Sequence, residues 1–85
     1  MPYEIELTQA AHRDYMSLPS NDRERIRKAI DTLELDPRPT GVRKIQGMEK
    51  AWRLRVSSYR ILYEVDDREQ KVVIYRVRHR RDVYR

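Results

Sequence analysis

The stretch AWRLRVSSYRILYEV, residues 51–65, contains two runs in which apolar and polar side chains alternate. Residues 51–57 place Trp52, Leu54 and Val56 on one side, and residues 59–65 place four large apolar residues on one side. Alternation with a period of two is typical of strands with one buried face. Because only a Ser-Ser pair separates the two runs, they predict an antiparallel hairpin.

Further strands are predicted on both sides of this hairpin. A polar loop at residues 66–70 leads into another alternating run at residues 71–78, and residues 42–46 form a short strand candidate before Gly47. Residues 3–7 alternate apolar and acidic side chains and predict an opening strand. In the last strand, the alternation predicts one face with Val73, Tyr75 and Val77 and another with Val72, Ile74, Arg76 and Arg78.

Two helices are predicted between the opening strand and the hairpin. Thr8 is a helix cap, and a short amphipathic helix follows until Pro19. Asn21 and Glu24 are spaced as in a capping box, and apolar residues at helical spacing predict a second helix to about Leu35. The fold class is therefore α+β, in the order β-α-α-β-β-β-β. Two helices pack on one face of a small, mainly antiparallel sheet, within a single domain of residues 1–85.

The composition limits the classes of function. The 85 residues include no cysteine, so disulfides, thiolate metal sites and cysteine catalysis are excluded. No apolar run approaches the roughly 20 residues of a membrane span, and we expect a cytoplasmic protein that does not contact a membrane. No convergent carboxylates, zinc spacing, phosphate loop or dinucleotide fingerprint is present, so neither a metal nor a cofactor is expected.

The positive charge is concentrated in the second half of the chain. Residues 1–41 carry 6 basic and 8 acidic side chains, whereas residues 42–85 carry 13 basic and 6 acidic ones. Of the 19 basic residues in the chain, 15 are arginine, which binds phosphates through two parallel hydrogen bonds. This segregation favours a half that binds a polyanion, although a solvated basic sheet without a ligand has the same composition.

The arginines of the hairpin fall on the face opposite its apolar residues. Arg53 and Arg55 are two residues apart on one strand, so they lie about 6.5–7 Å apart on one face, a spacing that suits successive phosphates of RNA. If the hairpin register adds Arg60, three guanidinium groups converge. The alternative is that each arginine is only the polar half of an alternating strand.

The C-terminal run RVRHRRDVYR, residues 76–85, contains the other candidate chemistry. Cleavage of RNA by its own 2′-hydroxyl needs a group that takes the 2′ proton, a group that protonates the 5′ leaving oxygen, and cations near the phosphorus oxygens. His79, Tyr84 and the arginines can supply all three without a metal. The alternative is a basic tail whose aromatic end packs on the sheet.

Several segments of this chain resemble the RelE/ParE superfamily of toxin–antitoxin toxins, in particular its RelE branch. The resemblance extends over nearly the whole chain. It includes Lys44-Ile45-Gln46-Gly47 and Trp52-Arg53-Leu54-Arg55. Its specific part is the motif Tyr59-Arg60-Ile61-Leu62-Tyr63 followed by His79-Arg80-Arg81-Asp82-Val83-Tyr84.

The resemblance implies a toxin that enters the ribosomal A site, beside the 16S rRNA, and cleaves mRNA by 2′-hydroxyl attack. It also implies inhibition by a small RelB-like antitoxin. By position in the motifs, Arg60 matches a phosphate-binding arginine, Arg80 a general acid or leaving-group stabiliser, and Tyr84 a tyrosine that orients the substrate nucleotide. Together with His79 these are the candidate catalytic residues. The candidate RNA-binding residues are Arg53, Arg55, Arg78 and Arg81.

This chain departs from the family pattern at the general base. Arg53 and Arg55 stand where well-known members carry lysine, and arginine does not readily release its proton. His79 or Tyr84 would then take the 2′ proton. Two other functions stay open: a ParE-like toxin that inhibits DNA gyrase without cleaving nucleic acid, and an RNA-binding relative without catalytic activity.

Overall fold

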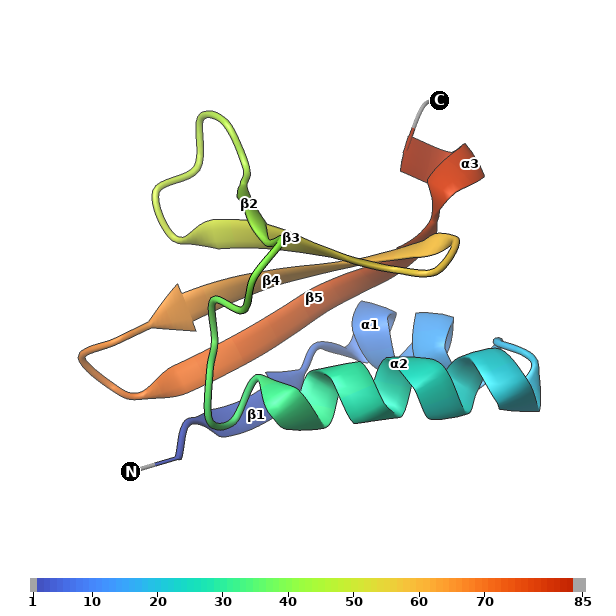
Figure 1. Ribbon diagram of the computed structural model, residues 1–85, viewed down its shortest axis with the longest axis horizontal. Coiled ribbons are helices and arrows are strands. Elements are labelled where there is room, and N and C mark those ends of the chain that lie inside the picture. The colour runs from blue at the N-terminus through green and yellow to red at the C-terminus, as the bar shows by residue number, and fades with distance from the viewer. Residues whose placement is uncertain (1, 84–85) are drawn as a thin grey trace.

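A computed structural model describes residues 2–83, with side chains up to Arg81, and contains the predicted sheet. Five strands lie in the order β1-β5-β4-β3-β2. Along the chain the elements are β1 (Glu4–Leu7), α1 (Gln9–Met16), α2 (Ser20–Thr32), β2 (Arg43–Lys44), β3 (Ala51–Val56), β4 (Tyr59–Asp66), β5 (Lys71–His79) and α3 (Arg80–Val83). Figure 1 shows α1 and α2 on one side of the sheet and α3 on the other.

The predicted α+β class is confirmed, and its sheet is mixed. β2, β3, β4 and β5 pair antiparallel in sequence order, whereas β1 pairs parallel to β5. The strand predicted at residues 42–46 is shorter than expected, since only Arg43 and Lys44 pair with β3. The two helices and the sheet close one apolar core. Its buried members are Ala11, Ile26, Ile30, Leu33, Leu54, Ile61, Tyr63, Val65, Val72, Ile74 and Val77.

The helices begin in different ways. The Thr8 side chain accepts a hydrogen bond from the backbone N–H of Ala11 at 3.1 Å, which confirms the predicted cap of α1. The capping box predicted at Asn21 and Glu24 is wrong, because α2 already begins at Ser20 and Pro19 occupies its N-cap position without a side-chain bond. No helix in residues 2–83 is long and apolar enough to cross a lipid bilayer.

A bulge in β5 overturns the simple alternation predicted there. Tyr63 pairs with Ile74 and Leu62 pairs with Arg76, so Tyr75 is an extra residue on the β5 side. Such an insertion shifts the following side chains to the opposite face. Val77 therefore joins Val72 and Ile74 in the core, instead of lying opposite them.

The edge of β5 beyond the bulge is closed by a side chain. β1 ends at Leu7, opposite Ile74, and α1 then follows. Asp14 of α1 accepts a hydrogen bond from the backbone N–H of Val77 at 3.0 Å and two from the guanidinium of Arg76 at 2.8 and 3.1 Å. The carboxylate thus continues the hydrogen bonding of this edge after β1 has ended.

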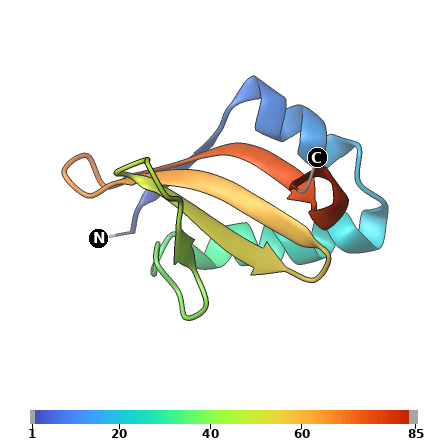
Figure 2. The ribbon, with the colours of Figure 1, turned by 90° about the horizontal axis from the view of Figure 1, so that it is seen from above.

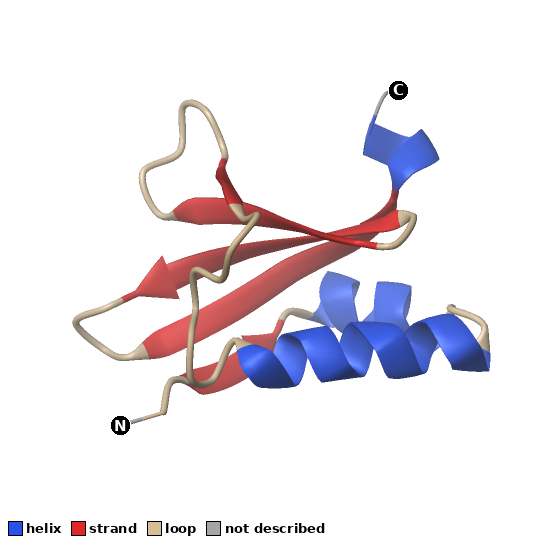
Figure 3. Cartoon of the chain, in the orientation of Figure 1, coloured by secondary structure: helices blue, strands red, loops and turns tan. Residues whose placement is uncertain are grey.

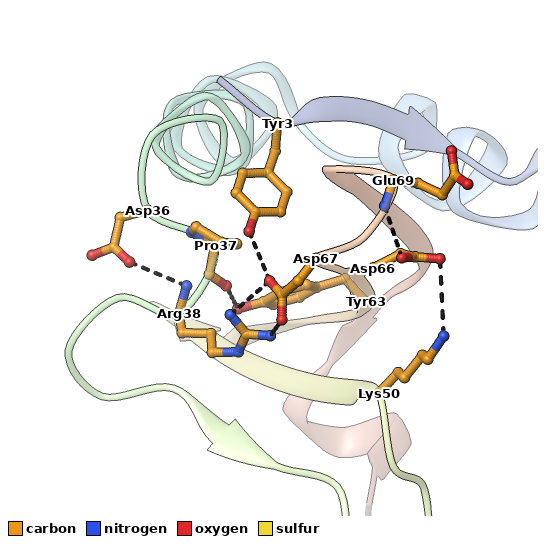
Figure 4. A network of polar contacts seen from close by, with 9 residues as sticks. All are labelled: Tyr3, Asp36, Pro37, Arg38, Lys50, Tyr63, Asp66, Asp67 and Glu69. Carbon is orange, nitrogen blue, oxygen red and sulfur yellow. Dashed lines mark hydrogen bonds and ion pairs between the residues drawn. The ribbon is translucent and has the colours of Figure 1, made fainter. Parts of the chain in front are cut away.

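A polar network ties the connection between α2 and β2 to the β4–β5 hairpin (Figure 4). Arg38 binds both carboxylate oxygens of Asp67, at 2.7 and 3.1 Å, and Tyr3 donates to the same carboxylate at 2.7 Å. The Arg38 and Tyr3 hydrogen bonds lower the pKa of Asp67. Beneath them, the buried Tyr63 hydroxyl donates to the Pro37 carbonyl at 2.7 Å. Figure 3 shows this connection as the loop that runs from the end of α2 to β2.

Candidate nucleic-acid interface

A two-residue turn determines which arginines face one another. Ser57 and Ser58 connect β3 to β4, and Ser57 adopts a left-handed φ of 56°. Positive φ at a central position is the requirement of tight hairpin turns. The resulting register places Arg55 directly opposite Arg60.

The same register continues into β5 and forms a row of arginines across three strands. Arg60 pairs with Arg55 on one side and with Arg78 on the other. Directly opposed side chains in a sheet have Cβ atoms about 4.5–5.5 Å apart, and like charges at this spacing repel each other. The convergence predicted for Arg55 and Arg60 is therefore present in the backbone register.

The row leads into a hollow beneath α3, which we call the arginine hollow. It is lined by Arg55, Ser57, Arg60, Arg80 and Arg81 and encloses about 250 Å³. Three elements contribute its cations: β3, β4 and the short helix α3. In the view from above, α3 lies over one end of the sheet, on the face turned away from α1 and α2 (Figure 2). None of the lining residues in the described part of the chain is acidic.

A second hollow adjoins the arginine hollow at Arg55. It is lined by Gly41, Arg43, Arg53 and Arg55 and encloses about 220 Å³. Arg53 lies opposite Arg43 in the β2–β3 pairing. Because Arg55 lines both hollows, an extended anionic chain can contact them in succession. Sequence reasoning missed Arg43, since the predicted short strand gave no indication of which face it would share.

Arg60 is more enclosed than the sequence predicts. We expected an exposed, outward side chain, but only 4% of Arg60 is accessible. The expected face is right, because Arg60 alternates with the core residues Ile61 and Tyr63. The exposure is wrong because α3 follows β5 directly, and its Arg80 and Arg81 line the same hollow. A short helix at this position was not predicted from the basic run.

The His79 side chain does not line the arginine hollow, although its Nδ1 accepts a hydrogen bond from the backbone N–H of Arg81. His79 pairs with Tyr59 across β4 and β5, and the two rings meet edge to face with centroids 5.2 Å apart. The Tyr59 hydroxyl in turn donates to Asp22 of α2 at 3.0 Å, so this pair lies on the helix side of the sheet. Burial and this hydrogen bond raise the pKa of Tyr59. Tyr84, the other candidate base, lies outside the described residues.

The arrangement is suited to holding phosphates and to stabilising negative charge. Hydrogen bonds from guanidinium groups aimed at a phosphate contribute most where water is partly excluded, as around Arg60. Arginine does not readily accept a proton, so the lining of the arginine hollow offers cations but no strong base. Among residues 2–83, no group of three or more histidine, aspartate or glutamate side chains is placed to hold a metal ion.

Comparison with known proteins identifies relatives over the whole length of the chain. The family described as ParE toxin of type II toxin-antitoxin system, parDE, matches residues 5–84. Toxin RelG of Mycobacterium tuberculosis is 35% identical over 86 residues, which cover 100% of this chain and 99% of that protein.

Solved structures show the same fold. A chain of the RelBE2 toxin–antitoxin complex from Mycobacterium tuberculosis matches with a TM-score of 0.82 and 28% identity, covering 93% of this chain and 99% of that one. A chain of the archaeal RelE–RelB complex from Pyrococcus horikoshii matches with a TM-score of 0.84 and 26% identity, covering 94% and 97%. The resemblance inferred from the sequence motifs is thus confirmed, and this chain belongs to the RelE/ParE family of type II toxin–antitoxin toxins.

Proposed function

We propose that this toxin is an endoribonuclease that cleaves mRNA in the ribosomal A site and so inhibits translation. The observation that carries the proposal is the row of Arg55, Arg60 and Arg78 beside the arginine hollow. A cationic row of this kind suits an anionic ligand, and Arg53 and Arg55, about 6.5–7 Å apart on one face of β3, suit successive phosphates of RNA. The site of action then lies in the cytoplasm.

The proposed reaction needs no metal ion. The 2′-hydroxyl passes its proton to Tyr84 in its phenolate form, its oxygen attacks the adjacent phosphorus, and the bond to the 5′-oxygen breaks. The leaving 5′-oxygen takes a proton from water, so the products carry a 2′,3′-cyclic phosphate and a 5′-hydroxyl. Arg60 and Arg55 hold the scissile phosphate, and Arg80 stabilises the negative charge that develops on the leaving oxygen. Arg53, Arg78 and Arg81 hold flanking phosphates. By family resemblance, Tyr84 also orients the substrate nucleotide, in addition to taking the 2′ proton.

We also propose a small acidic antitoxin as the partner of this chain. The relatives from Mycobacterium tuberculosis and Pyrococcus horikoshii were solved as toxin–antitoxin complexes, and the latter holds RelB. The excess of positive charge in residues 42–85 favours a partner whose carboxylates reach the arginines. Apolar contacts beside the helices would provide affinity that salt does not screen.

Cleavage is tested by adding purified toxin to a translation extract and mapping mRNA ends by primer extension. We expect breaks within ribosome-bound codons and 5′-hydroxyl ends, whereas free mRNA stays intact. Because the matching family is described by its ParE toxins, a gyrase supercoiling assay runs in parallel. If the ribosome-bound mRNA stays intact and gyrase is inhibited, the proposal of cleavage is refuted in favour of gyrase inhibition.

The role of the arginine row is tested by Arg60→Met. Loss of one charged contact to the transition state should lower the cleavage rate by about 10²–10³-fold. Arg25→Met is the matched control, because Arg25 is an exposed arginine of α2 on the other side of the molecule. Thermal unfolding verifies that both variants are folded. If folded Arg60→Met cleaves as fast as the control, Arg60 is not part of the site.

A further inference from the structure

The ring of His79 holds the first turn of α3. Its Nδ1 accepts the backbone N–H of Arg81 at 3.2 Å, which is the bond that a helix N-cap residue makes. A second bond runs from the Arg80 N–H to the Ser58 carbonyl at 2.7 Å. These two bonds join the helix that carries Arg80 and Arg81 to the end of β5 and to the β3–β4 turn.

The orientation of the His79 ring is itself determined by packing. The edge-to-face contact with Tyr59 has an interplanar angle of 90°, and Tyr59 is fixed by its hydrogen bond to Asp22. A continuous series of contacts therefore runs from α2 through Tyr59 and His79 to α3. The last member of this series, α3, lines the arginine hollow through Arg80 and Arg81.

The hydrogen bond determines the tautomer of the neutral imidazole. An Nδ1 that accepts a hydrogen bond carries a lone pair, so the proton of the neutral ring is on Nε2. In this state Nδ1 is occupied and Nε2 has no free lone pair. Neither nitrogen of His79 is then available to take the 2′ proton of an RNA.

We propose that His79 is a positioning residue, which caps α3 and so places Arg80 and Arg81 over the arginine hollow. The expected effect on the cleavage rate rests on the proposed function, whereas the hydrogen bond of the cap is present whether or not the protein cleaves RNA. Protonation of His79 abolishes the acceptor at Nδ1. The cap is therefore present when the ring is neutral and is lost when the ring is charged.

The charged groups around His79 on each packed element determine the response to acid. α2 contributes Asp22, which is bonded to Tyr59 of β4, and α1 contributes Asp14, which is bonded to Arg76 and to the Val77 N–H. Arg78 precedes His79 on β5, and Arg80 and Arg81 follow it on α3. Both carboxylates already have donors, whereas an imidazolium at the start of α3 would be a fourth cation beside Arg78, Arg80 and Arg81.

Three substitutions separate capping from other roles. His79→Asn places an amide oxygen near the position of Nδ1 and does not titrate, and asparagine is among the preferred N-cap residues. His79→Gln carries its amide one carbon farther out, near the position of Nε2. His79→Ala removes both positions. Cleavage of ribosome-bound mRNA is measured for all four proteins between pH 6 and 8.

We expect cleavage by the wild type to fall about fivefold when acid protonates the His79 ring, beyond any change in ribosome activity measured with a pH-independent nuclease. His79→Asn should match the wild type within about twofold at pH 8 and show no decline in acid. His79→Gln and His79→Ala should be about fivefold slower at every pH. If His79→Asn loses cleavage as completely as His79→Ala while melting normally, the ring takes part in the chemistry and the proposal is refuted.

NMR spectroscopy provides a readout that does not depend on cleavage. In the wild type, the Arg81 amide signal should shift with the titration of the His79 ring nitrogens, and in His79→Asn it should stay constant. An Arg81 amide that does not follow His79 would refute the cap even if cleavage were observed. If no cleavage occurs but the Arg81 amide follows His79, the proposed function fails and the cap stands.

Discussion

The buried hydroxyl group of Tyr63 allows us to predict how much one hydrogen bond contributes to the free energy of unfolding. Its side chain has 0% exposure, and its hydroxyl donates to the Pro37 carbonyl at 2.7 Å. Tyr63→Phe removes this donor, so the carbonyl oxygen of the buried Pro37 loses that hydrogen bond. Loss of one partner of a buried hydrogen bond costs about 1–3 kcal/mol, so the free energy of unfolding should fall by that amount. In a domain of this size, each kcal/mol corresponds to a Tm lower by about 4–8 °C.

The same residue should contribute to the loss of stability in alkali. Burial raises the pKa of Tyr63 to about 12, whereas tyrosine in an unfolded chain titrates near its model value of 10.0. The folded state thus retains a proton that the unfolded state releases more easily. This pKa difference contributes on the order of 2–3 kcal/mol to the free energy of unfolding. The stabilisation is complete below about pH 10 and is lost as the pH rises toward about 12.

The assay is urea unfolding at a series of pH values from about 7 to 11, with Tyr15→Phe as the control. Tyr15 is a half-buried tyrosine of α1, so the control removes the same atom from a less enclosed ring. The wild type should lose its advantage over Tyr63→Phe as the pH rises above about 10, whereas its difference from Tyr15→Phe should stay small. A difference between wild type and Tyr63→Phe that is near zero at pH 7, or constant to pH 11, would refute the reasoning.

Three further predictions concern ion pairs and charge. Asp14→Ala should lower the free energy of unfolding by about 1.5–3 kcal/mol in urea denaturation, because Arg76 and the Val77 N–H lose an acceptor whose side chain is only 20% exposed. Asp31→Ala, which removes a 57% exposed ion pair on α2, should cost less than about 1 kcal/mol in the same measurement. Association with an acidic antitoxin, followed by stopped flow, should slow by tenfold or more between about 0.05 and 0.5 M salt, because screening removes electrostatic steering. An association rate that is independent of salt would show that the antitoxin first contacts another surface.

The sequence alone determined the layers of this fold and the face that carries the arginines. Alternation in residues 51–65 depends only on the strand period of two, so Arg53, Arg55 and Arg60 had to fall opposite the apolar residues. The Ser-Ser pair is short enough to require a hairpin, and that hairpin brought Arg55 opposite Arg60. The family was equally evident from local motifs, which do not depend on long-range contacts.

Only the tertiary structure decided features that depend on elements far apart in the chain. The bulge at Tyr75 lies just beyond Ile74, where β1 stops pairing with β5 while β4 continues, and no local signal marks it. Arg60 is enclosed because α3, which begins 20 positions later at Arg80, returns over the hollow. His79 faces the helices because the bulge shifts β5 by one residue, and a shift of one residue exchanges the two faces of a sheet.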